Sequence, residues 1–403
     1  MTALSTKLEP LAIQGGAPVR ETLLPYGKQN LDEADIRAVV EVLRSDWLTT
    51  GPKVQQFEEA FAGRVGARFA VSFSSGTAAL HGAAFAAGLG SGDEAVVTPL
   101  TFCATANCVL YQGATPTFAD VSDDTLNLDP QKVAEKISPR TKAVIAVDYA
   151  GHPAALEELQ LIARKAGAIL IEDACHAMGA EYSSKPVGSI ADMTVFSFHP
   201  VKHVTTGEGG MVTTNDARLA ETLRRFRNHG ISSEARQRHE AGQWFYEMVL
   251  LGFNYRLTDI ACALGLSQLG KLRENVVRRR EIADRYTRTF VGLPVRLPAV
   301  RTDVAPAWHL YPVRLELESL TVGRAEIFGA LRAENIGVNV HYVPVHLHPY
   351  YRERFAGQPG VCPVAEDAYE RLISLPMFHS MTDRDVDDVI RAVHKVLGHY
   401  AKK

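Results

Sequence analysis

The sequence predicts an α/β protein with a mostly parallel central sheet and a smaller C-terminal α+β domain. Short apolar runs alternate with helical patterns between Phe69 and Ile171, which is typical of a parallel sheet covered by helices on both faces. From about Leu257 a long helical pattern leaves this region, and mixed strands and helices follow it. The length of 403 residues also favours two domains over a single core.

The first segment, residues 1–30, is expected to form an N-terminal arm. Gly15, Gly16, Pro18 and Pro25 interrupt every regular pattern in it. The large domain is expected to span residues 31–269, and the small C-terminal domain to span residues 270–403. We find no internal repeat and no low-complexity linker between them.

The predicted elements follow in chain order. Asp32 can cap a first helix, in which apolar residues recur at helical spacing at Ile36, Val39, Val40 and Leu43, and Phe57–Phe61 continues this pattern. Buried strands are expected at Phe69–Phe73, Ala95–Thr98, Thr117–Ala119, Ala143–Val147 and Ala168–Ile171, with further strand-like runs at Met193–Phe196 and Met211–Val212. Helices are expected at Ala78–Ala87 and Leu156–Ala166.

The elements after Leu257 belong mainly to the predicted small domain. Helical spacing continues through Ile260, Ala263, Leu264, Leu269 and Leu272. Beyond it, strands are expected at His309–Leu315 and Val338–Val343, and helices at Arg324–Glu334 and Asp383–Leu397. This mixture predicts the α+β character of the small domain.

Composition describes an ordinary soluble protein. A net charge of −3 provides no general attraction to nucleic acid or to an anionic membrane. No run approaches the roughly 18 apolar residues of a membrane span, and residues 1–10 lack the apolar core of a signal peptide. The five cysteines show no C-x-x-C spacing, which favours reduced thiols in the cytoplasm over disulfides or a zinc site: Cys103, Cys108, Cys175, Cys262 and Cys362.

The chemistry is expected to centre on Lys202, in the stretch Ser197–Gly210 with the sequence S-F-H-P-V-K-H-V-T-T-G-E-G-G. Apolar neighbours at Val201 and Val204 can desolvate the amine, which lowers its pKa and makes it a nucleophile. The alternative is an ordinary solvated lysine in a loop. Taken alone, the stretch does not decide between these interpretations.

Three further patterns have both a functional and a structural interpretation. Ser75, Gly76 and Thr77 stand where a strand turns into a helix, and can form a phosphate cup or a simple helix cap. Asp173 ends a buried strand and can hold a cationic ring nitrogen, or cap a helix. His176 can hydrogen-bond a ring oxygen, or make one local bond.

Other motifs carry less weight. Phe102 follows a strand end and can stack on a planar cofactor, or belong to the core. A metal site at His341, His346 and His348 is disfavoured, because their spacing does not place two ligands on one helix face and no acidic residue stands near them in the chain. A basic stretch is interpreted as a solvated helix and loop rather than a nucleic-acid patch: Arg224, Arg225, Arg227, Arg236 and Arg238.

Together, these residues suit pyridoxal 5'-phosphate. The cup at Gly76 and Thr77 would hold the phosphate, and Phe102 would stack on the ring. Asp173 would keep the pyridine nitrogen protonated, and Lys202 would form the Schiff base. Each of these residues has an ordinary structural interpretation when it is considered alone. Considered together, they predict a cofactor site.

At this point the chain resembles the fold-type-I sugar aminotransferases of the DegT/DnrJ/EryC1/StrS family over nearly its whole length. The matching motifs are S-G-T-A-A-L at Ser75–Leu80, Glu172 and Asp173 with His176, the Ser197–Gly210 stretch, and G-F-N-Y-R-L at Gly252–Leu257. Three further motifs resemble the UDP-4-amino-4,6-dideoxy-N-acetyl-β-L-altrosamine transaminases of the pseudaminic acid pathway: D-Y-A-G at Asp148–Gly151, L-S-Q-L at Leu266–Leu269 and H-Y-V-P-V-H at His341–His346.

The resemblance implies a role for each matched residue. It implies Lys202 as the Schiff-base lysine, Asp173 at the pyridine nitrogen and His176 near the ring hydroxyl of the cofactor. It also implies further cofactor contacts: Phe102 against the ring, Gly76, Thr77 and Ser197 at the phosphate, and Asn254 at the phosphate of a neighbouring subunit in a homodimer. Lys202 argues against the family's dehydratases, which carry histidine at that position.

The function implied is transfer of an amino group from L-glutamate to C4 of a UDP-linked 4-keto-6-deoxy-N-acetylhexosamine. Loops around residues 230–247 and Tyr342 are expected to select the nucleotide sugar. One alternative is the same chemistry on another keto sugar, such as a dTDP-linked 3- or 4-keto hexose. The other is a non-catalytic sugar-binding or regulatory protein on the same fold. The complete set of cofactor residues argues against this second alternative.

Overall fold

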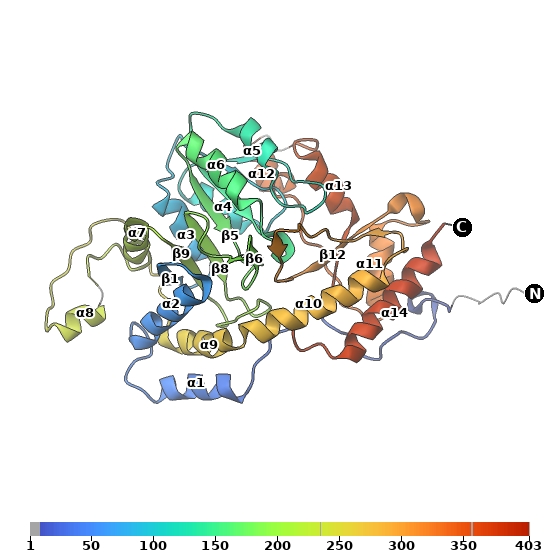
Figure 1. Ribbon diagram of the computed structural model, residues 1–403, viewed down its shortest axis with the longest axis horizontal. Coiled ribbons are helices and arrows are strands. Elements are labelled where there is room, and N and C mark those ends of the chain that lie inside the picture. Colours follow the sequence, from blue (N-terminus) through green and yellow to red (C-terminus); the bar gives the residue numbers. More distant parts are fainter. Residues whose placement is uncertain (1–8, 234, 356–357, 403) are drawn as a thin grey trace, which may run out of the picture.

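The computed structural model describes residues 9–233, 235–355 and 358–402. Its centre is a seven-stranded sheet with the order β1-β9-β8-β5-β4-β2-β3, and helices surround it (Figure 1). The strands are β1 (Phe69–Phe73), β2 (Glu94–Val97), β3 (Thr115–Phe118), β4 (Thr141–Val147), β5 (Ile169–Asp173), β8 (Met193–Ser197) and β9 (Gly210–Thr214). β9 alone runs antiparallel to its neighbours, which confirms the predicted mostly parallel sheet.

Helices cover the two faces of the sheet because successive strand residues point to opposite sides. Ile171, for example, packs into one core and the preceding Leu170 into another. The first face carries α3 (Gly76–Ala86), α4 (Ala104–Tyr111) and α7 (Ala217–Arg227). The second face carries α2 (Pro52–Val65), α5 (Pro130–Lys136), α6 (Leu156–Ala166) and α9 (Asp259–Gly270), and α1 (Glu33–Leu43) lies against α9.

The carboxyl ends of the parallel strands share one edge of the sheet. β5 ends there at Asp173 and β8 ends at Ser197, while the segment after β2 leads to Phe102. In open α/β sheets this edge is the usual place for ligands. The topology therefore gathers residues that are far apart in the sequence.

The C-terminal region is built on a smaller antiparallel sheet with the order β10-β12-β13. Helix α10 (Leu272–Thr289) runs from α9 towards this region (Figure 1). The apolar core there joins α10 to the sheet, α11 and α14. The bounds are β10 (Val295–Arg296), β12 (Tyr311–Leu315), β13 (Leu372–Leu375), α11 (Arg324–Ala333) and α14 (Asp383–Tyr400).

Shorter elements fill the connections: α8 (Ala235–Glu240), α12 (Pro349–Phe355), α13 (Pro363–Arg371), β6 (Glu181–Tyr182), β7 (Lys185–Pro186) and β11 (Val304–Ala305). Four single turns of 3₁₀-helix lie at Ala12–Gln14, Tyr149–Gly151, Leu317–Ser319 and Val345–Leu347. None of the helices in the described ranges is both long and apolar enough to cross a bilayer.

The N-terminal segment lies against the C-terminal region. Leu11 and Leu24 are buried in the same core as α11 and α14. The backbone N–H groups of Ala12 and Val19 each donate to one carboxylate oxygen of Glu334, both at 2.9 Å. Two buried leucines and two charge-assisted bonds therefore anchor this segment on an element more than 300 residues away.

One predicted strand is wrong, and most of the other predicted boundaries shift by one to three residues. Val338–Val343 forms no strand, because this segment makes only single bridges, with Asn339 opposite Ser374. β13, which the periodicity did not reveal, takes the place beside β12. The helical pattern after Leu257 divides into α9 and α10 around Lys271, and α3 begins two residues earlier than expected.

Candidate active site

Lys202 lies in the loop between β8 and β9, at the carboxyl edge of the sheet. Ser197 and Gly210 pair at the base of this loop. Inside it, the Thr206 N–H donates to the Phe198 carbonyl at 3.0 Å, and the Thr205 hydroxyl donates to the same oxygen at 3.1 Å. These bonds fix the loop and leave the Lys202 side chain only partly exposed.

The environment of the Lys202 amine disfavours its charged form. Burial lowers its pKa from 10.5 to about 8; the acidic neighbours Cys175 and Asp173 oppose the change, and Arg279 adds to it. Roughly a tenth of the amine is therefore neutral at pH 7, against about 0.03% for an ordinary lysine. This is the state that a nucleophilic lysine needs.

Asp173, the last residue of β5, is buried and held by two donors. The Thr105 hydroxyl donates to its Oδ2 at 2.7 Å, and the backbone N–H of Cys175 donates to its Oδ1 at 3.2 Å. β5 is followed by a turn instead of a helix, so Asp173 is not a helix cap. Each carboxylate oxygen has a second lone pair that can accept a cationic N–H.

His176, Tyr342 and Phe102 form a connected group of rings. The Nε2 atom of His176 lies 3.0 Å from the Tyr342 hydroxyl, and the rings of Tyr342 and Phe102 are 6.3 Å apart. Phe102 is 58% exposed, so it does not belong to the core. Burial, and next the charge of Lys202, lower the pKa of His176 well below 6.5. This histidine is therefore neutral at physiological pH.

The start of α3 lies against the end of β8. The Ser75 hydroxyl accepts the Ala78 N–H at 3.1 Å, so Ser75 is the helix cap. Thr77, in the first turn, remains partly exposed. A Cβ on Gly76 would lie 3.0 Å from the Ser197 Cβ and 3.2 Å from its hydroxyl oxygen, so glycine lets the two elements approach without displacing Ser197. The helix N-terminus and two hydroxyl groups thus meet in one place.

Sequence analysis missed three residues that adjoin the predicted ones: Thr105, His309 and Arg279. The Nε2 atom of His309 lies 3.4 Å from the Nζ atom of Lys202. Arg279, on α10, donates to the His309 carbonyl at 3.2 Å. The contacts of Thr105 with Asp173, of His309 with Lys202 and of Arg279 with His309 join residues that are 68, 107 and 30 positions apart in the chain, so no local spacing in the sequence could reveal them.

Asn254 lies apart from this group in the single chain. It is exposed, and its backbone bridges to Asn228. The segment before it carries a series of exposed apolar side chains, among which Trp244 is 84% and Leu251 is 73% exposed. This segment follows α8, which projects from the body of the molecule (Figure 1).

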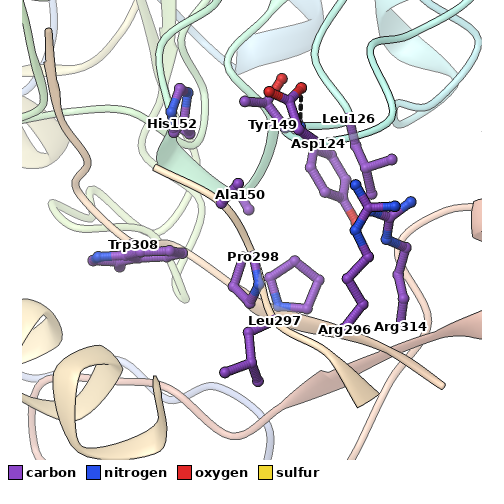
Figure 2. A pocket seen from close by; sticks show the side chains of 13 residues that line it. Asp124, Leu126, Tyr149, Ala150, His152, Arg296, Leu297, Pro298, Trp308 and Arg314 are labelled. Carbon is purple, nitrogen blue, oxygen red and sulfur yellow. Dashed lines mark hydrogen bonds between the residues drawn. The ribbon is translucent and has the colours of Figure 1, made fainter. Parts of the chain in front are cut away.

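Two cavities open elsewhere, and Lys202 lines neither. The smaller one, about 20 Å³, lies where Tyr149 and Ala150 meet Trp308 and Arg314 (Figure 2). The larger one, about 780 Å³, is lined by the basic stretch that we expected to be a solvated helix and loop. Its arginines are Arg68, Arg224, Arg225, Arg227, Arg236, Arg238 and Arg256.

The histidines considered for a metal site have other partners. His346 contacts Glu366 of α13, with Nε2 and Oε1 2.9 Å apart. An acidic partner is therefore present, although the sequence around the histidines showed none. The Nδ1 atom of His341 lies 2.9 Å from the Ser374 hydroxyl. Across the described ranges, no cluster of three or more potential ligands could hold a metal ion.

The residues at the sheet edge fit pyridoxal 5'-phosphate. Lys202 offers a largely desolvated amine, and Asp173 a fixed carboxylate. Gly76 opens space at a helix N-terminus. The Nδ1 atom of His176 is buried without a hydrogen-bond partner among the described residues, as expected of a group that awaits a ligand.

Comparison with known proteins agrees with this geometry. Residues 29–394 match the DegT/DnrJ/EryC1/StrS aminotransferase family. The spore coat polysaccharide biosynthesis protein SpsC of Bacillus subtilis is 44% identical over 381 residues, which cover 94% of this chain and 98% of that protein.

Two solved structures are also similar. Helicobacter pylori PseC, an aminotransferase involved in pseudaminic acid biosynthesis, has 34% identity and a TM-score of 0.87, with 94% of this chain and 100% of that chain covered. The putative sugar aminotransferase Spr1654 of Streptococcus pneumoniae, in its PMP form, has 31% identity and a TM-score of 0.88, with 93% and 99% covered. A PLP form of Spr1654 is similar as well.

These likenesses extend over nearly the whole chain and include the fold-type-I arrangement of the seven-stranded sheet. The chain therefore belongs to the DegT/DnrJ/EryC1/StrS aminotransferase family, as a nucleotide-sugar aminotransferase that depends on pyridoxal 5'-phosphate.

Proposed function

We propose that the protein transfers the amino group of L-glutamate to C4 of a UDP-linked 4-keto-6-deoxy-N-acetylhexosamine, as in pseudaminic acid biosynthesis. The reaction type is inferred from the Lys202 amine, whose pKa is lowered to about 8 and which lies near the fixed carboxylate of Asp173. The likeness to PseC and the motif at His341–His346 support the choice of sugar.

Each site residue has a proposed part in this reaction. Pyridoxal 5'-phosphate, when bound, carries the amino group and accepts electrons from the substrate carbon. Lys202 would attach the cofactor and, once released, move a proton at the reacting carbons. Asp173 would keep the pyridine nitrogen protonated, and Thr105 would orient Asp173 through their 2.7 Å bond.

The remaining residues would bind the cofactor and the sugar. Gly76, Thr77 and Ser197 would hold the phosphate at the start of α3, which favours an anion. Phe102 would lie against the cofactor ring, and His176 near its hydroxyl group. Tyr342, bonded to His176, would lie beside the sugar.

We further propose a homodimer in which Asn254 completes the phosphate site of the partner. The exposed apolar side chains between Trp244 and Phe253 support this, since such a series is costly in water and typical of an interface. A mixture of Lys202→Ala and Asn254→Asp proteins provides the test. Because mixed dimers would contain one intact site, reassociation should restore roughly a quarter of the wild-type activity. No recovery would contradict a shared site.

The arginine-lined cavity suits the diphosphate of the nucleotide sugar in this dimer. It includes Arg256 and Asn228, which are the neighbours of Asn254 in sequence and in backbone pairing. Arg256 donates to the Asn228 side chain at 2.8 Å, and its buried Nε has no partner among the described residues. We expect Arg256→Gln to raise KM for the nucleotide sugar and to leave KM for L-glutamate unchanged.

The substrate is tested by assaying UDP-linked and dTDP-linked keto sugars side by side with L-glutamate. Formation of 2-oxoglutarate and of the amino sugar would be measured for each. Preference for the dTDP-linked 3- or 4-keto hexoses would replace the proposed substrate. The loss of cofactor absorbance and of turnover in Lys202→Ala would support the enzyme, whereas retained turnover would contradict the role of Lys202.

A further inference from the structure

The strongest unexplained contact in the site is the one between His309 and Lys202. The two nitrogen atoms, Nε2 of His309 and Nζ of Lys202, are 3.4 Å apart. His309 is only 6% exposed. It lies two residues before β12 of the C-terminal region, whereas Lys202 lies in the loop between β8 and β9 of the central sheet. The contact therefore joins the two parts of the molecule at the reactive amine.

Hydrogen bonds of its own backbone fix the position of His309. Its N–H donates to the Ala150 carbonyl at 2.9 Å, and its carbonyl accepts from Arg279 at 3.2 Å. Gly151 has a φ of +96°, and a Cβ there would lie 2.9 Å from the His309 nitrogen. Only glycine therefore permits this close approach. The backbone of His309 is thus held in place by contacts that do not depend on a ligand, and from this position its ring reaches Lys202.

The other histidines near Lys202 direct a ring nitrogen elsewhere. His176 contacts the Tyr342 hydroxyl, His341 contacts Ser374, and the Nε2 atom of His203 lies 3.0 Å from the Ala307 carbonyl. Within the described part of the chain, His309 is the histidine with a hydrogen-bond contact to the lysine amine. Burial, and next the charge of Lys202, lower the pKa of His309 well below 6.5. The His309 ring is therefore neutral, and one of its nitrogen atoms can accept a hydrogen bond.

We propose that His309 is the positioning residue for the free amine of Lys202, accepting a hydrogen bond at Nε2 whenever Lys202 is not attached to the cofactor. The bond would keep Nζ at the reacting position between the half-reactions, when a flexible lysine could otherwise turn away. It would also stabilise the protonated amine, because a neutral acceptor favours the charged donor. This inference rests on the proposed role of Lys202.

Other charged and titratable groups also influence Lys202. Asp173 and Cys175 raise its pKa, whereas Arg279 lowers it. The neighbouring histidines, His176, His203 and His341, have lowered pKa values and are uncharged at neutral pH. Replacing His309 removes none of these groups and changes no formal charge. A shift in the titration of Lys202 would therefore report the missing acceptor.

The test is competitive acetylation of the full-length protein in its pyridoxamine phosphate form, in which Lys202 is free. Acetic anhydride would be added between pH 6 and 11, and the peptide containing Lys202 quantified by mass spectrometry. His309→Leu should lower the midpoint of labelling by about one pH unit or more, since it removes a bond to a charged group. His309→Gln, which offers a carbonyl acceptor, should stay close to the wild type.

His203→Gln is the matched control, because His203 is equally buried but contacts a carbonyl instead of Lys202. Its labelling midpoint should equal that of the wild type. An unchanged midpoint in His309→Leu, or equal shifts in His309→Leu and His309→Gln, would overturn the proposal. Labelling does not depend on turnover. Retained turnover in Lys202→Ala would instead refute the proposed function. Failure of the His309 proposal and failure of the proposed function are therefore detected by different measurements.

A second measurement needs no folded His309→Leu variant. In wild-type protein with ¹⁵N-labelled histidine, the ring nitrogens of His309 can be observed by solid-state NMR and assigned by their absence in His309→Gln. Acceptance at Nε2 requires the proton to be on Nδ1. A protonated Nε2 at pH 7 would overturn the proposal.

Discussion

The turn at Gly151 offers the sharpest test of how the site is assembled. Replacement by alanine puts a Cβ on a residue with φ of +96°, which costs about 1–2 kcal/mol. That Cβ would also lie 2.7 Å from the His176 carbonyl oxygen and 2.7 Å from the Trp308 nitrogen. Because backbone atoms cannot rotate away, the segments must separate, at a further cost of roughly 1–3 kcal/mol. We expect a total destabilisation of about 2–5 kcal/mol.

Gly167→Ala is the matched control. Gly167 also has a positive φ, +66°, but a Cβ there would meet nothing within 4 Å. It should therefore cost only the backbone strain, about 1–2 kcal/mol. Urea unfolding of the full-length variants would measure both free energies, and the visible absorbance of the bound cofactor would report the site. Equal destabilisation in the two variants, with normal absorbance in Gly151→Ala, would refute the reasoning.

Three further predictions concern the site and its support. The rate at which cofactor-free protein takes up pyridoxal 5'-phosphate should rise with pH, reach half its maximum near pH 8 and level off above about pH 9, because attachment needs the neutral Lys202 amine. A rate that still climbs at pH 10 in stopped-flow absorbance would contradict this. Asp173→Asn should lower kcat at least ~100-fold, whereas Thr105→Val should lower kcat less than ~10-fold. An equal loss of kcat in the two variants would show that Asp173 acts only through its orientation. Glu58→Gln should destabilise the protein by about 3 kcal/mol in urea, because Glu58 pairs with the buried Arg227; a change below 1 kcal/mol would contradict the importance of this pair.

Much of the site could be predicted because it lies at strand ends. Asp173 and Ser197 each end a strand of the parallel sheet, and periodicity alone locates such ends to within a few residues. Parallel strands bring their carboxyl ends to one edge, so the predicted residues meet without further information. Lys202 follows from the same rule, as a residue in the loop after β8. Local chemistry and this topological rule were enough for Asp173 and Lys202, whereas the roles of Ser197 and Asn254 were implied only by the resemblance to the family.

The contacts across the two parts of the chain could not be predicted. His309 reaches Lys202 only because Gly151 allows close packing and Arg279 holds the His309 backbone. The segment Val338–Val343 has the apolar pattern of a strand, yet it is not one, because β13 occupies the place beside β12. In both cases the outcome depends on which distant backbone supplies the partner, and local patterns do not contain that choice.

The sequence by itself determined the alternation of strands and helices in the large domain, the polar residues at the strand ends and the set of groups that suits pyridoxal 5'-phosphate. These depend on side-chain periodicity and on residue chemistry, which are local properties. Only the tertiary structure decided which groups surround Lys202, and therefore its pKa of about 8. It also decided that His309 faces the amine and that the arginines line one cavity. Burial and hydrogen-bond geometry arise when distant segments pack together, so they appear only in the folded chain.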